Sequence, residues 1–159
     1  MSKILDCQQR IVDLLNADTF FNDPITAHKL LAITQRKGNI QSEVQQKLIR
    51  TGAGVIVMLP LMIWEGEADR KTLGLKFGII VTENPTVNQS THGTLKSAEA
   101  IVEKIIQLIH YKPNAAGISP HSKTGLYMID RNAVRMMEPT PGTMILINYI
   151  VSVNTSITL

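Results

Sequence analysis

The sequence predicts an α+β fold, with helices packed on one face of a mostly antiparallel sheet of about five strands. Two stretches repeat their apolar residues at helical spacing, one near the N-terminus and one at about 94–111. Two others alternate apolar and polar residues, as a strand with one buried face does. Four of the five predicted strands occur as two adjacent pairs, which is typical of a segregated α+β sheet. The expected order of elements is α-β-α-β-β-α-β-β.

All 159 residues are expected to form one domain, because single domains cluster near about 100–150 residues. Apolar residues make up 44% of the chain and charged residues 18%, which argues against disorder. The single cysteine, Cys7, cannot form an internal disulfide, which fits a reducing compartment. Neither a membrane span nor a secretory signal is expected, since no long apolar run is present.

The N-terminal segment is predicted to form a helix that ends near Leu15, with Ser2 as its cap. Residues 25–36 are predicted to form a strand, with helix as the alternative because Lys-Leu-Leu-Ala contains good helix formers.

A short helix is predicted next, over residues 41–50, with Asn39 or Ser42 as its cap. Gly52 follows the end of this helix, where a left-handed backbone conformation favours glycine.

A long antiparallel hairpin is predicted over about residues 54–83, with a charged connection at 66–72. Its first strand is a dense apolar run, and its second strand alternates apolar and polar residues. Pro60 has no N–H to donate, so the first strand is expected to be edge-like or bulged at that point. Trp64 and the methionines are interpreted as core residues.

The most regular helix is predicted at about residues 94–111, with Thr94 or Ser97 as its cap. A second long hairpin follows over about residues 125–158, with a turn at 139–142. Strands usually have about 5–6 residues, and these look about twice as long. Long strands that project from a small core expose edges, which monomers avoid, so a homo-oligomer is expected.

The motifs that resemble catalytic or binding sites are interpreted as structural. Residues 117–124 resemble a phosphate-binding loop, but Ser122 replaces its second glycine and the segment precedes a strand. The four histidines lack metal-ligand spacing, and no nucleophile elbow surrounds Ser90. No catalytic residue, cofactor or metal is therefore predicted, and the chain is not expected to be an enzyme.

The charged residues form two groups of opposite sign within a net charge of +3. Residues 29–50 are mainly basic, whereas residues 65–69 are acidic and are followed by Arg70 and Lys71. Opposite patches can steer association between copies of one chain. The residues of this possible subunit interface are Lys29, Arg36, Lys37, Arg50, Glu65, Glu67, Asp69 and Arg70.

Two alternatives to an assembly role stay open. The basic segment could form a nucleic-acid surface, although it lacks the interleaved aromatic residues that stack on bases. A small enzyme would instead need a concave pocket with converging polar groups.

Four segments carry a family resemblance: the strands at 54–60 and 75–84, the helix at 95–111 after Glu83-Asn84-Pro85, and the strand at 145–155. In this order, from about residue 4 to residue 158, the chain resembles the small tail-terminator or tail-completion proteins of tailed bacteriophages and prophages. The resemblance implies an α+β subunit without catalytic residues, and a ring of about six copies that caps the tail tube and joins it to the head connector. It also implies a location in the bacterial cytoplasm during assembly and in the virion tail afterwards, without membrane partners.

Overall fold

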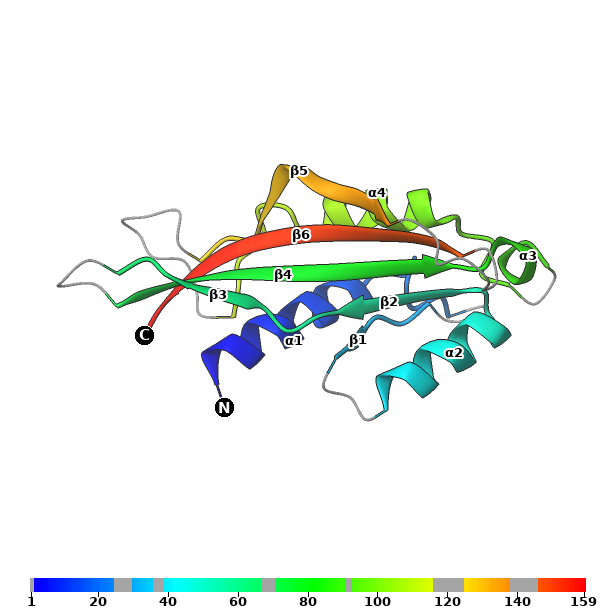
Figure 1. The fold of residues 1–159 in the computed structure, drawn as a ribbon, viewed down its shortest axis with the longest axis horizontal. Coiled ribbons are helices and arrows are strands. Elements are labelled where there is room, and N and C mark those ends of the chain that lie inside the picture. Colours follow the sequence, from blue (N-terminus) through cyan, green and yellow to red (C-terminus); the bar gives the residue numbers. More distant parts are fainter. Residues whose placement is uncertain are drawn as a thin grey trace.

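The computed structural model describes residues 2–24, 30–35, 39–66, 71–90, 93–115, 125–137 and 146–159 (Figure 1). Helices and strands follow one another in an α+β fold, as predicted. Their bounds are α1 Lys3–Asn16, β1 Ile33–Thr34, α2 Ile40–Arg50, β2 Ala53–Val57, β3 Leu61–Trp64, β4 Thr72–Glu83, α3 Pro85–Asn88, α4 Ala98–Ile109, β5 Met128–Met137 and β6 Ile147–Thr158.

Within the described residues, six strands form one mixed sheet, in the order β1-β2-β4-β6-β5, with β3 also paired to β4. All pairs are antiparallel except β1 with β2, which are parallel because α2 connects them as a crossover. The prediction of a mostly antiparallel sheet is thus confirmed, and the parallel β1 is the exception. The predicted hairpin at 54–83 is present as β2 and β3 against β4, and the second hairpin as β5 against β6.

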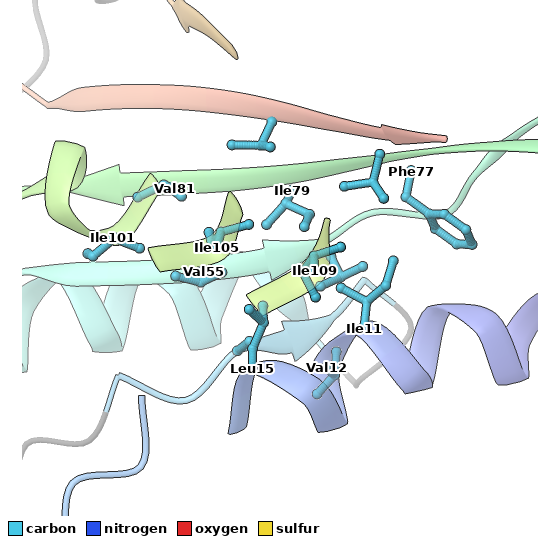
Figure 2. Close-up of a cluster of buried hydrophobic side chains, with 14 of the residues drawn as sticks. Ile11, Val12, Leu15, Val55, Phe77, Ile79, Val81, Ile101, Ile105 and Ile109 are labelled. Carbon is cyan, nitrogen blue, oxygen red and sulfur yellow. The ribbon is translucent and has the colours of Figure 1, made fainter. Parts of the chain in front are cut away.

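The main core lies between this sheet and helices α1 and α4, as the close-up of side chains from all three shows (Figure 2). The predicted alternation in β4 is confirmed, because every second residue from Leu75 to Val81 is buried. The β4 and β6 residues of this core are Leu75, Phe77, Ile79, Val81, Val151, Val153 and Ile157.

A smaller group of buried side chains lies on the opposite face of the sheet. Ile33 and Ile56 are paired in register and buried, but they alternate with core residues and lie outside the main core. Leu48 of α2 is also buried outside the main core, and α2 contacts β2. We conclude that α2 covers this face at β1 and β2. The prediction that all helices pack on one face is therefore wrong for α2, whose apolar side meets the reverse of the sheet.

The first strand of the predicted hairpin is interrupted at Pro60. Val57 pairs with Ile79 and Leu61 pairs with Lys76, so this strand holds one residue more than β4 between the two pairs. The interruption splits the strand into β2 and β3, which confirms the bulge expected from a proline that cannot donate to the ladder.

Helix ends follow the expected capping chemistry in most places. The Asn39 side chain accepts from the Ser42 N–H, and Ser97 accepts from the Ala100 N–H. Ser2 is the N-cap residue of α1, as predicted, but its side chain makes no capping hydrogen bond. Gly52 has a φ of +77°, the left-handed conformation that was predicted.

The sequence did not predict α3, a single turn whose cap is Asn84, because Asn84-Pro85 was interpreted only as the end of a strand. A proline at the first helical position is compatible with a helix start. The predicted strand at 25–36 is confirmed only at β1, since residues 30–32 are not strand and residues 25–29 and 36 lie outside the described residues. The phosphate-loop-like segment and the turn at 139–142 also lie outside them.

Candidate functional site

The most unusual surface of the protein is the strand β3. All four of its side chains are exposed: Leu61 by 63%, Met62 by 57%, Ile63 by 50% and Trp64 by 58%. A strand that covers a core alternates buried and exposed residues. Both faces of β3 are therefore open to solvent, although its composition is that of a core strand.

The position of β3 in the sheet explains this exposure. It pairs with residues 73–76 of β4, beyond the end of β2, where β4 continues past the body of the protein (Figure 1). Among the described residues β3 pairs only with β4, so its outer edge is open. We call β3 with the adjoining part of β4 the β3 arm. The sequence predicted a core position for Trp64, and the exposure of this side chain shows that the prediction is wrong.

The outer edge of β3 presents unused backbone groups. The Glu65 N–H donates to the Thr72 carbonyl of β4 at 3.0 Å. Because antiparallel strands alternate their hydrogen-bonding direction, the N–H of Ile63 also faces β4, and the N–H groups of Met62 and Trp64 point outward. Such an edge is a template for another strand.

The opposite edge of the sheet is β5. Its pairing with β6 shifts by three residues between Ile129 and Val134, so β5 is bulged in the middle and straight only at its ends. In the second straight part Val134 is 41% exposed and Met136 is 59% exposed, and Arg135 is exposed between them. The methionines Met62 and Met136 were predicted to fill the core, and their exposure contradicts that prediction.

At the third margin, the backbone directly before β1 is covered by a side chain. The Asn16 amide nitrogen donates to the Ala32 carbonyl at 3.0 Å, and the Ala32 N–H donates to Asn16 Oδ1 at 2.8 Å. This pair of hydrogen bonds imitates a neighbouring strand. β1 therefore differs from β3, whose outer backbone groups have no such cover among the described residues.

Of the eight residues predicted as a subunit interface, the structure describes Arg50 and Glu65, and both are exposed. They lie at opposite ends of the sheet, because Arg50 precedes the start of β2 and Glu65 follows the end of β3. The fold does not bring these two residues together within one molecule. The other six predicted residues lie outside the described residues; they are Lys29, Arg36, Lys37, Glu67, Asp69 and Arg70.

Glu65 itself is held on the face of the sheet opposite α1 and α4. Its Oε2 accepts a hydrogen bond from Ser156 Oγ at 3.0 Å, and its carboxylate lies over Gly74. Any β-carbon at position 74 would meet Glu65 Oε1 at 2.5 Å, so the glycine makes room for the acid. A negative charge is thus fixed beside the outer end of β3.

The buried polar groups are used for structure. Glu83 is 3% exposed, and its carboxylate accepts from the Ala98 N–H and from the Asn88 amide, each at 2.7 Å. The same Asn88 amide donates to the Lys96 carbonyl at 2.7 Å, and its Oδ1 accepts from the Thr94 N–H at 3.1 Å. The network caps the N-terminus of α4, where the helix dipole favours a negative charge.

Other ionisable groups are engaged in the same way. Burial raises the pKa of Tyr127, whose hydroxyl donates to the Cys7 carbonyl at 2.6 Å. The His110 ring accepts at Nδ1 from the Ile129 N–H at 3.0 Å. The Lys47 ammonium, within the basic segment, donates to the Leu31 carbonyl.

Glu99 and Tyr149 form an exposed hydrogen-bonded pair at the start of α4. The Tyr149 hydroxyl donates to Glu99 Oε1 at 3.0 Å. A backbone N–H at the helix start and this hydroxyl lower the pKa of Glu99, and the bond to the carboxylate raises the pKa of Tyr149.

The hollows among the described residues are shallow in chemical content and lie between structural elements. The hollow at the base of the β3 arm has a volume of about 360 Å³ and is lined by residues that include Ile63, Lys76 and Asn154. Within the described ranges, no three acidic, histidine or cysteine side chains gather as metal ligands would. None of the helices in those ranges is long and apolar enough to cross a membrane.

Comparisons with known proteins leave the family open. No protein-family model matches the chain, and no curated protein matches its sequence.

Proposed function

We propose that the protein is a structural subunit that works by associating with copies of itself, in the manner of a tail terminator. The observation that carries the proposal is the β3 arm, in which four consecutive apolar side chains and an open backbone edge are exposed together. Soluble monomers blunt such edges, and exposed apolar patches mark interaction sites. Burying these side chains in an interface would remove the cost of exposing them.

The larger assembly follows from the resemblance stated above. The subunits would form a ring of about six copies that caps the tail tube and presents a surface to the head connector. The described residues serve this role as a rigid α+β body with a projecting arm. The proteins of the tube and of the connector are the proposed partners, and assembly takes place in the bacterial cytoplasm.

Sedimentation of the purified protein over a range of concentrations tests this function. The expected result is an oligomer in equilibrium with monomer, and salt should weaken it where charged patches contribute. A protein that stays monomeric at the highest concentration reached, with and without a tail-tube protein, would contradict the proposal.

A triple charge reversal tests the charged part of the interface. Changing Glu65, Glu67 and Asp69 to Lys should weaken association, because like charges would replace opposite ones. The circular-dichroism spectrum and the thermal midpoint should stay close to those of the native protein. A control variant reverses Glu103, an exposed acidic residue of α4, and should leave association unchanged.

A further inference from the structure

Within the described residues, the edge of β3 and the second straight part of β5 are open, and their strand directions are those that a closed ring requires. From β3 through β4 and β6 to β5, every pair is antiparallel, so β3 and β5 run in opposite directions. A rotation about an axis roughly along the strands keeps the direction of each strand. The β3 of one copy would then lie antiparallel to the β5 of the next copy, and the sheet would continue without a mismatched pair.

The two edges also match in length and in the faces of their side chains. β3 has four residues, and the straight part of β5 after the bulge runs from Val134 to Met137. In a fully overlapped antiparallel register, Ile63 lies opposite Arg135, and Trp64 lies opposite Val134. Within the chain, Ile63 pairs with Gly74 and Arg135 pairs with Ile150. Both partners lie on the face of the sheet away from α1 and α4, so Ile63 and Arg135 lie on that face too.

The charges at the two edges are complementary. The Glu65 carboxylate is fixed on the face away from α1 and α4, beside the outer end of β3. Arg135 is exposed on the same face of β5. In this register the acid is a diagonal neighbour of the arginine, within reach of a long side chain. If the β3 edges of two copies paired with each other instead, each copy would bring its Glu65 carboxylate, and two negative charges would meet.

The offset between the edges has the size that a closed barrel needs. The four residues of β3 pair with residues 73–76 of β4, which in turn pair with residues 154–157 of β6. The straight part of β5 pairs with residues 148–151 of β6, six residues away along the strand. Six residues at about 3.3 Å give an offset of about 20 Å, while four strands at about 4.8 Å span about 19 Å. The resulting tilt of about 45° agrees with the 35–45° typical of barrels.

We infer that the β3 edge binds the β5 edge of a neighbouring copy, so that the four strands β3, β4, β6 and β5 repeat around one continuous antiparallel sheet. This inference rests on the proposed self-association and names the surfaces that carry it. The occupant of the exposed β3 edge is thus residues 134–137 of a second copy of the same chain.

Disulfide trapping between two variants that each carry one added cysteine tests the pairing. The Ile63 N–H faces β4, so position 63 would occupy a non-hydrogen-bonded site between copies, where opposed Cα atoms are about 4.5 Å apart. That distance is within the span of a disulfide. Ile63→Cys and Arg135→Cys are purified separately, mixed, and oxidised with oxidised glutathione. The native protein, whose Cys7 is fully buried, is the control.

The expected product is a covalent dimer that forms only in the mixture of the two variants. A dimer formed by Ile63→Cys alone would show that β3 pairs with itself about a two-fold axis, and would overturn the inference. If the native protein associates but the mixture gives no dimer, the inference fails and the proposed function stands. If the native protein does not associate under any condition, the proposed function fails as well.

A backbone substitution gives a second measurement that needs no cross-link. Met62→Pro removes an N–H that points away from β4, so the ladder within the chain stays intact and association should be lost. The matched variant Met62→Thr keeps this N–H and should retain association to a larger extent. An unchanged oligomer in Met62→Pro, with a native circular-dichroism spectrum, would overturn the inference.

Discussion

At the scale of single residues, Asn88 connects segments that are distant in sequence. Its side chain joins the carboxylate of Glu83 to the backbone of residues 94 and 96, and so fixes the connection that leads into α4. The sequence contains no periodic signal for such a contact, because it depends on one amide and on the path of a loop. This explains why the sequence predicted α4 but not the network that holds its start.

Removing the Asn88 side chain should destabilise the fold. Asn88→Ala leaves one oxygen of the buried Glu83 without that donor, and the free energy of unfolding should fall by about 1–3 kcal/mol. Chemical denaturation measures the change. Gln89→Ala, at an exposed neighbouring position, is the control and should change stability by less than about 0.5 kcal/mol. Equal stability of both variants would show that the network contributes nothing.

Two glycines offer a matched test of a close approach. Gly52 has a φ of +77°, and a β-carbon there would lie 2.3 Å from the Asn88 backbone nitrogen. Gly52→Ala should therefore lower the free energy of unfolding by more than about 1 kcal/mol. Gly54, two residues on, has no atom within 4 Å of such a carbon, so Gly54→Ala should be close to neutral. Equal losses in thermal midpoint would contradict this explanation.

At the scale of elements, periodicity predicted the strands and helices that have one buried face. β4, β6 and α4 each show it, because the core selects apolar residues at every position that faces it. β3 could not be predicted in the same way. Its continuous apolar residues are equally compatible with a strand buried on both faces and with a strand exposed on both faces.

A pair of aromatic substitutions separates these two situations. Phe77→Ala in β4 removes a fully buried ring and should cost about 3–5 kcal/mol of unfolding free energy. Trp64→Ala removes a side chain that is 58% exposed, and should change monomer stability by less than about 1 kcal/mol while weakening association. Denaturation at low concentration and sedimentation at high concentration measure the two effects. A large loss of monomer stability in Trp64→Ala would mean that the ring belongs to the core.

At the scale of the whole molecule, the sequence predicted the class and the two hairpins but not the arrangement of layers. The apolar side of α2 is equally compatible with either face of the sheet, since a pattern of residues carries no information on which face a crossover takes. Arg50 and Glu65 were predicted as interface residues from their charge alone, and their positions at opposite ends of the sheet depend on topology. Contacts between copies would have to join such ends.

The side chain of Asn16 affects where another strand could join the sheet. Its two hydrogen bonds occupy the outward backbone groups of Ala32, directly before β1, and so hinder the addition of another strand at that edge. Association of copies through strand edges would then use β3 and β5. Asn16→Ala would remove both hydrogen bonds and leave a third edge of the sheet open. Light scattering should then detect branched, disordered aggregates in place of a defined particle.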